Sequence, residues 1–224
     1  HHKWPDREVY ALVGSFTALT YLSPLVGGWI ADKLIGQKRA ILLGASILFF
    51  SYCSLSWFDT NLSLICSLAG IAVGTGLLKP NISSLLGNEY PLSSPRRESG
   101  FTIFYMGINL GAFFSPLVCG SMDFKWGFLA ACIGMVIGLI TFIMFQKKYL
   151  ISEEGKEIGV PVKALDLKAI LMIVGSIGII FFMLNFKQMF KSDIEIISYF
   201  IYGAMIVMPI IILSDKSLTS TERK

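Results

Sequence analysis

A lysine followed by a proline stands inside one of the most apolar stretches of the sequence. In GTGLLKPNISS, Lys79 is the only charged residue between Leu62 and Glu89. An ammonium group at the centre of a bilayer costs at least about 2.5 kcal/mol, so a lysine there indicates a function. A buried lysine gains or loses its proton according to whether a carboxylate is near, so Lys79 could sense both an anionic substrate and protonation. The structural alternative is a lysine whose long side chain reaches the membrane surface.

A second polar cluster stands in the stretch GGWIADKLIGQKRA. Asp32 follows an apolar run, at the end of a helix where the helix dipole disfavours a carboxylate. We therefore expect it to have a partner, either a cation or the N-terminus of another helix. We expect the basic residues beyond it to stay in the cytoplasm. Taken alone, the stretch is equally compatible with an ordinary solvated loop. Its notable residues are Gly28, Asp32, Lys33, Gly36, Lys38 and Arg39.

The elements that carry these residues are predicted to cross a membrane. Hydrophobic residues make up 54% of the 224 residues and charged residues 15%. Uncharged runs of about 18 residues or more predict membrane-spanning helices. The loops between them are too short for a soluble domain, so we predict an all-α integral membrane protein with seven spans. They are residues 9–31, 40–58, 62–88 (interrupted by Lys79), 101–122, 127–146, 169–186 and 196–214.

The positive charges of the loops fall mainly on one side of the membrane. With the loops taken alternately, thirteen lysines and arginines lie on one side and five on the other. The richer side is cytoplasmic by the positive-inside rule, which places residues 1–8 outside and the C-terminal end in the cytoplasm. The same distribution argues against a nucleic-acid partner for the net charge of +4.

The first five spans and the last two differ in composition. Pairs of glycines four residues apart, which allow close helix packing in lipid, occur in the third, fourth and fifth spans. The last two spans are bulky, uncharged and suited to a lipid-facing hairpin. We therefore predict a packed unit over 1–146, a charged cytoplasmic linker over 147–168, a peripheral hairpin over 169–214 and a cytoplasmic segment over 215–224. The glycine pairs are Gly70 and Gly74, Gly107 and Gly111, and Gly134 and Gly138.

Cysteine and histidine usage indicates no metal site. The four cysteines lie in or beside the spans and form no CxxC pair, so we interpret them as small apolar filler without a disulfide framework. The two histidines are the first two residues, and neither is predicted to bind a metal. The cysteines are Cys53, Cys66, Cys119 and Cys132.

Three stretches resemble one transporter family. The stretch around Asp32 resembles the loop motif of the major facilitator superfamily, Gly-x-x-x-Asp-Arg/Lys followed by Gly and basic residues, with one extra residue before Gly36. This longer form, and YLSPLVGG before it, are similar to the proton-dependent oligopeptide transporter family. GTGLLKPNISSLLG resembles the fourth helix of that family. RRESGFTIFYMGINLGAFFSPL resembles its fifth-helix signature at Phe101, Tyr105, Asn109 and Gly111.

The resemblance implies a partial major facilitator fold and proton-coupled symport of di- and tripeptides, with a proton gradient and no cofactor. Tyr21, Lys79 and Asn109 would line the central cavity. Lys79 would attract the peptide carboxylate and pair with an acid of the C-terminal bundle, while the other two would hydrogen-bond the peptide backbone. Pro80 would let the helix bend, and the motif around Asp32 would belong to the cytoplasmic gate. The amide of Asn109 has donors and an acceptor for any peptide bond, although it could instead join two helices, and Tyr21 could be a packing aromatic.

The family's first helix, with its Glu-x-x-Glu-Arg motif, and its C-terminal bundle have no counterpart in the sequence. We therefore expect helices two to six plus the inter-bundle hairpin, with the C-terminal bundle supplied by another chain or absent. A permease for another small solute and a non-transporting fragment remain alternatives. A membrane enzyme would need an acid/base pair, nucleophile or metal ligands at depth, and the spans contain no His, Asp or Glu, so we do not predict an enzyme.

Overall fold

The computed structural model describes residues 5–91, 93–151, 157–160, 174–175 and 178. Its long helices each coincide with one of the first five predicted spans and are long and apolar enough to cross a membrane, which confirms the predicted helical membrane fold. The predicted spans 169–186 and 196–214 and the segment 215–224 lie outside the described residues, apart from 174–175 and 178. The helices are α1 (Asp6–Ile30), α2 (Gln37–Trp57), α3 (Asn61–Glu89), α4 (Arg96–Gly120) and α5 (Phe124–Tyr149).

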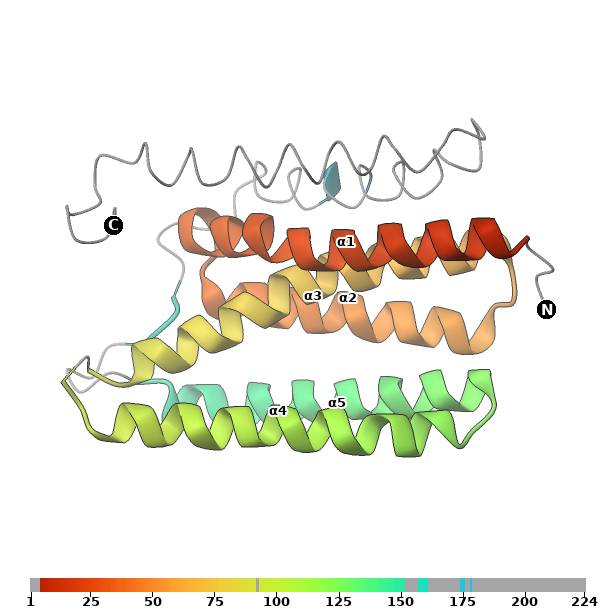
Figure 1. The fold of residues 1–224 in the computed structure, drawn as a ribbon. Helices are drawn as coiled ribbons and strands as arrows, with labels where there is room; N and C mark the ends of the chain where they lie inside the picture. The colour runs from red at the N-terminus through yellow and green to blue at the C-terminus, as the bar shows by residue number, and fades with distance from the viewer. Residues whose placement is uncertain (1–4, 92, 152–156, 161–173, 176–177, 179–224) are drawn as a thin grey trace.

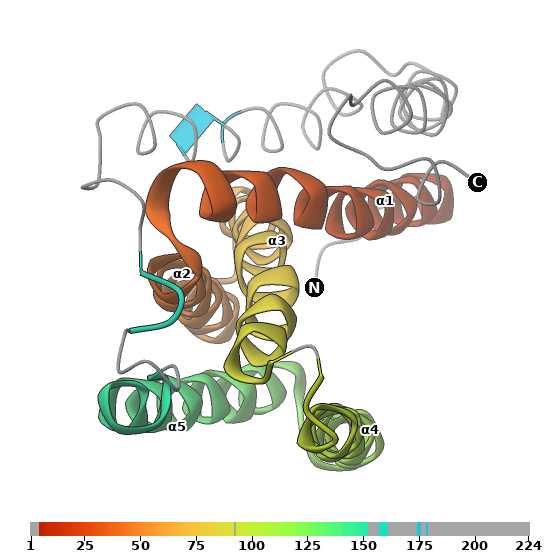
Figure 2. The same ribbon diagram turned by 90° about the vertical axis from the view of Figure 1, so that its left-hand side faces the viewer.

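The helices form two groups, α1 to α3 and the pair of α4 and α5. The groups meet mainly where α2 packs on α5. Helix α3 packs against α1 on one side and α2 on the other, while α2 also packs against α5. Helix α4 lies beside α5 and touches α3 only slightly. Seen along the bundle, α3 lies between α1 and the pair of α4 and α5 (Figures 1 and 2). The end of α1, the start of α2 and the end of α3 therefore share one end of the bundle, the predicted cytoplasmic end.

Small residues explain why α2 and α3 pack so closely. A Cβ atom on Gly44 of α2 would lie 2.7 Å from the carbonyl oxygen of Gly74, and one on Gly74 would lie 2.8 Å from Cγ of Leu48. Close backbone approach of this kind is how helices associate in lipid, where burial of apolar surface gives no driving force. Of the three predicted glycine pairs, only the pair on α3 packs in this way. The pairs on α4 and α5 meet no atom within 4 Å in the described part of the chain.

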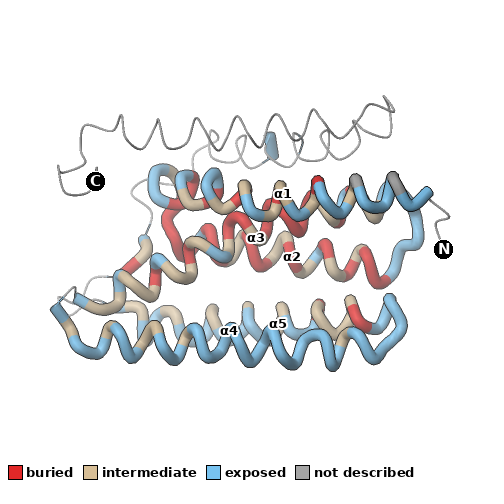
Figure 3. The backbone as a smooth tube through the Cα atoms, viewed as in Figure 1, coloured by how far each residue is buried: buried red, intermediate tan, exposed pale blue. Residues whose placement is uncertain are grey.

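The buried core belongs to the first three helices. Its largest fully buried side chains are those of Ile30, Ile35, Ile65, Leu77 and Asn81. Helix α4 has no buried residue and α5 has only Gly127 and Cys132, a contrast visible along the tube in Figure 3. In a membrane, the apolar faces of α4 and α5 are left to lipid or to further helices.

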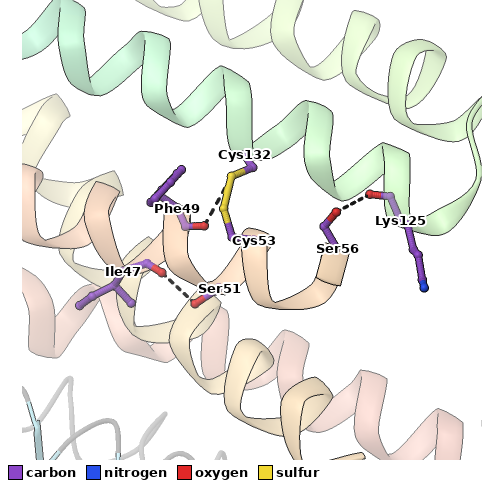
Figure 4. Close-up of a disulfide and its surroundings, with 7 residues drawn as sticks. All are labelled: Ile47, Phe49, Ser51, Cys53, Ser56, Lys125 and Cys132. Atoms are coloured by element: carbon purple, nitrogen blue, oxygen red, sulfur yellow. Dashed lines mark hydrogen bonds between the residues drawn. A yellow bond between two sulfur atoms is a disulfide. The ribbon is translucent and has the colours of Figure 1, made fainter. Parts of the chain in front are cut away.

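Two of the cysteines are paired, contrary to the prediction of unpaired filler. Cys53 on α2 and Cys132 on α5 form a disulfide with a Cα–Cα distance of 5.9 Å (Figure 4). Ser56, one turn further along α2, donates a hydrogen bond to the carbonyl oxygen of Lys125 at 3.0 Å. The two cysteines are 79 residues apart in sequence, so only the packing of α2 on α5 brings them together.

Candidate functional site

Tyr21 on α1 and Lys79 on α3 face each other across the contact between these helices. The Nζ atom of Lys79 lies 5.9 Å from the centroid of the Tyr21 ring, within reach of a cation–π contact. Tyr21 is nine residues from the end of α1 and Lys79 ten from the end of α3. At 1.5 Å per residue, both lie about 13–15 Å from the predicted cytoplasmic end. Only the family resemblance, which assigns both residues to one cavity, indicated before the structure that they lie near each other.

Both polar groups of this pair are open to a ligand. The Tyr21 side chain is 73% exposed, and Lys79 is also exposed. Lys79 forms no ion pair with any residue that the structure describes. An exposed ammonium at this depth can attract a carboxylate, and the phenol beside it can donate or accept a hydrogen bond.

Small residues hold α1 and α3 together next to this pair. The hydroxyl of Ser23 donates a buried hydrogen bond to the carbonyl oxygen of Ala72 at 2.7 Å. A Cβ atom on Gly27 would overlap the carbonyl of Gly76 and lie 2.9 Å from the backbone nitrogen of Leu77. Only a residue without a side chain fits at Gly27. These contacts position the backbone on which Tyr21 and Lys79 are mounted.

Pro80 of the predicted site and Gly28 of the predicted motif meet at the same seam. A Cβ atom on Gly28 would lie 3.8 Å from Cβ of Pro80, an ordinary van der Waals distance. The ring of Pro80 therefore packs against α1 at Gly28, where no side chain covers the helix backbone. Gly28 has room for a methyl group, whereas Gly27 has none.

Asn109, the third predicted cavity residue, is placed apart from the other two. It is exposed near the middle of α4, in an open groove that it lines with Thr102, Tyr105, Met106 and Leu110. The side chain of Asn109 forms no hydrogen bond with another residue in the described ranges. The proposed alternative role, an interhelical hydrogen bond, is therefore not seen among the described helices.

The motif around Asp32 forms the turn between α1 and α2. Helix α1 widens into a π-helical turn, η1 (Ala31–Ile35), in which Asp32 and Lys33 are exposed. Gly36 follows with a φ of 80°, a conformation that favours glycine. The expected partner of Asp32 is not found among the residues that the structure describes.

Lys38 does not fit the alternative of an ordinary solvated loop. Its side chain is buried, with Nζ 3.4 Å from the carbonyl oxygen of Leu150 and 3.6 Å from a carboxylate oxygen of Glu157. Its backbone N–H donates to the carbonyl oxygen of Gly159 at 3.1 Å, at the start of a helix that has no side-chain cap. The segment after α5 thus supplies the cap of α2. Lys33 and Arg39 are exposed, as residues of a solvated loop would be.

Three amide and hydroxyl side chains beside the motif were not predicted as a group. Gln37 donates to the hydroxyl of Ser84 at 2.8 Å and accepts from the amide of Asn88 at 3.0 Å. This network ties the start of α2 to the end of α3. Ser84 and Asn88 are four residues apart on one helix face, which is the signal that could have indicated them. No cluster of three potential metal ligands occurs in the described ranges.

Comparison with known proteins gives matches over nearly the whole chain. The uncharacterized transporter YclF of Bacillus subtilis is 34% identical over 219 residues, which are 95% of this chain and 44% of that protein. The di-/tripeptide transporter of Lactococcus lactis subsp. lactis is 35% identical over 243 residues, covering 98% of this chain and 46% of that protein. The chain therefore spans about half the length of the curated relatives it matches.

Solved structures give the same result for the fold. The crystal structure of a POT family transporter in complex with 5-aminolevulinic acid matches 97% of this chain and 47% of that chain, with 33% identity and a TM-score of 0.74. That of a POT family transporter in complex with a thioalcohol-conjugated peptide matches 98% and 47%, with 31% identity and a TM-score of 0.76. Residues 38–212 match the POT family itself. Since that match covers most of the sequence, the chain belongs to the POT family, the proton-dependent oligopeptide transporters.

Proposed function

We propose that the protein carries di- and tripeptides across a membrane together with protons. The family and the named di-/tripeptide transporter of Lactococcus lactis support this substrate class. A proton gradient supplies the driving force and no cofactor takes part. The role is transport and not catalysis, because a POT family chain moves its ligand without changing it.

The observation that carries the proposal is the exposed Lys79 ammonium beside Tyr21, ten residues from the predicted cytoplasmic end of α3. Every di- and tripeptide has a terminal carboxylate, which a fixed ammonium group attracts whatever the side chains are. The Tyr21 hydroxyl and the Asn109 amide suit the other constant part of a peptide, its backbone. In this proposal, Lys79 also pairs with an acid of the C-terminal bundle when no substrate is bound.

The chain supplies one wall of the transport site. We assign α1 to α5 to helices two to six of the N-terminal bundle, residues 147–168 to a cytoplasmic linker and residues 169–214 to a membrane hairpin. Alternating access requires two bundles that rock about a shared site. The facing wall therefore lies outside these 224 residues. The turn with Asp32 belongs to the cytoplasmic gate, where Asp32 meets the other bundle.

A second candidate substrate is a small amino acid with a free carboxylate. One of the similar structures is a complex with 5-aminolevulinic acid. Such a ligand offers the same carboxylate to Lys79, but no peptide bond to Tyr21 and Asn109.

Uptake in liposomes separates peptide symport from transport of a small amino acid. The intact protein for this experiment is the transporter with both walls of the site. With an inward proton gradient, radiolabelled Ala-Ala should accumulate, and a protonophore should abolish the accumulation. Unlabelled di- and tripeptides should compete strongly and 5-aminolevulinic acid weakly. Strong competition by 5-aminolevulinic acid alone would favour the second candidate. Absence of gradient-driven Ala-Ala uptake would contradict peptide symport.

We further propose that the protein lies in the inner membrane, with the Asp32 turn and the C-terminal end in the cytoplasm. Single cysteines at Lys33 and Asn61, both exposed, lie at opposite ends of the helices. With the four native cysteines replaced by serine, an impermeant thiol reagent should label the cysteine at Asn61 in intact cells. The cysteine at Lys33 should react only after the cells are opened. The reverse pattern would invert the orientation.

A further inference from the structure

Asn81, the residue after Pro80, is a polar side chain at the centre of the packed helices. It is 1% exposed and is among the largest fully buried side chains of the described residues. A buried amide without hydrogen bonds is costly in an apolar environment, so its partners are expected to matter. Its Nδ2 atom donates to the carbonyl oxygen of Leu77 at 2.7 Å and reaches the carbonyl oxygen of Gly27, on α1, at 3.4 Å.

These partners are placed where Pro80 disturbs α3. A proline has no N–H, so the helical hydrogen bond to the carbonyl of Gly76 cannot form, and the ring crowds that carbonyl. The next carbonyl along the chain, that of Leu77, is the one that receives the Asn81 side chain. Asn81 thus adds a side-chain donor to the turn in which Pro80 lacks a backbone N–H, and Leu77 and Asn81 are each two residues from Lys79.

The second partner belongs to the helix that carries Tyr21. Gly27 is the residue whose bare backbone touches Gly76, and its carbonyl also accepts the N–H of Ala31, at the start of the π-helical turn. The Asn81 side chain therefore links the turn of α3 that lacks a backbone N–H at Pro80 to the start of the π-helical turn that follows α1. The side-chain amide of Asn81 bonds to the backbones of the two helices that carry Lys79 and Tyr21.

From this geometry we propose that Asn81 is a positioning residue for the substrate site, which fixes Lys79 relative to Tyr21 through the carbonyls of Leu77 and Gly27. The proposal rests on the proposed function for its effect on transport. Its structural part, the fixed geometry of α1 against α3, stands independently of any substrate.

Two substitutions separate the two hydrogen bonds. Asn81→Leu keeps a similar volume and removes both donors. Asn81→Ser keeps a hydroxyl that can bond back to the carbonyl four residues earlier, that of Leu77, as serines in helices do, but it is too short to reach Gly27. The matched control is Asn61→Leu, the same change on the same helix but at its exposed first residue, far from Lys79.

The transport experiment uses the intact protein in liposomes and measures KM and kcat for Ala-Ala. Asn81→Leu should raise KM about tenfold, because displacing Lys79 from Tyr21 should cost about one hydrogen bond to the substrate, with kcat within about twofold. Asn81→Ser should be intermediate, and Asn61→Leu should match the wild type. A purely structural role would lower the amount of active protein and leave KM unchanged. An unchanged KM for Asn81→Leu, or an equal rise for Asn61→Leu, would overturn the proposal.

A second measurement needs no transport. Cysteines at positions 21 and 79, in a protein whose native cysteines are replaced, should be joined readily by a short bifunctional thiol reagent. Adding Asn81→Leu should slow this cross-linking several-fold, while adding Asn61→Leu should not. If the wild type transports no peptide, the proposed function fails and the cross-linking rates alone decide on Asn81. Equal rates with and without Asn81→Leu would show that Asn81 does not fix the two helices.

Discussion

Lys79→Ala is expected to reduce proton-driven dipeptide uptake by the intact protein at least about 30-fold. Truncation of one member of a desolvated charge pair costs about 2–5 kcal/mol, and 2 kcal/mol corresponds to roughly a factor of 30. The Lys79 ammonium is the one charge that the described helices place at this depth beside Tyr21. Lys79→Arg should retain only part of the activity, because a guanidinium is larger and flatter than an ammonium group.

The control for charge removal is Lys147→Ala, at the exposed end of α5. Uptake of Ala-Ala in liposomes should stay within about twofold of the wild type, since an exposed charge contributes little. Membrane insertion and detergent-extracted yield of Lys79→Ala should equal those of the wild type. Wild-type uptake by Lys79→Ala would mean that Lys79 only reaches toward the membrane surface and serves no substrate.

Gly27→Ala is expected to disrupt the protein, whereas Gly28→Ala is expected to be tolerated. The added methyl group at Gly27 would overlap the backbone of Gly76 and Leu77, which cannot move aside as a flexible side chain can. Overpacking in a packed core costs about 1–3 kcal/mol, and more when backbone must shift. At Gly28 the same methyl group would meet only the ring of Pro80, at 3.8 Å.

The two variants differ by one position in the same helix, so each controls for the other. The measurement is the monodisperse yield in detergent and the midpoint of thermal unfolding. Gly27→Ala should give a lower midpoint by several degrees or no folded protein, and Gly28→Ala should match the wild type. Equal behaviour of the two variants would show that α1 and α3 are not in backbone contact at Gly27.

The membrane spans could be predicted because lipid imposes a strict rule on the sequence. A helix in hydrocarbon must be long and apolar, so uncharged runs alone located α1 to α5. Packing within the bundle was less predictable. A glycine four residues from another indicates close packing, yet Gly70 and Gly74 meet α2 while the pair of Gly107 and Gly111 meets no described atom. Whether a glycine makes a close contact depends on whether a neighbouring helix lies against its side of the helix.

Pairings between distant residues could not be predicted from spacing. The disulfide joins two cysteines 79 residues apart, and Lys38 is buried by a segment that follows α5. Asn81 looked like an ordinary helix residue, because the carbonyl that it reaches on Gly27 belongs to another helix. Lys79 was indicated by its charge inside an apolar run, and Tyr21 and Asn109 only by the family resemblance. The roles of all three in binding stay predictions.

The most direct measurement compares Ala-Ala with Ala-Ala amide as competitors of labelled dipeptide uptake, in the wild type and in Lys79→Gln. The amide lacks the terminal carboxylate but is otherwise the same molecule, so the ratio of the two inhibition constants reports the recognition of that carboxylate. If Lys79 binds it, the wild type should prefer Ala-Ala by about tenfold or more, as for a charge-assisted hydrogen bond. In Lys79→Gln the preference should fall to nearly one. A preference that persists unchanged in Lys79→Gln would contradict the assignment of Lys79 as the carboxylate site.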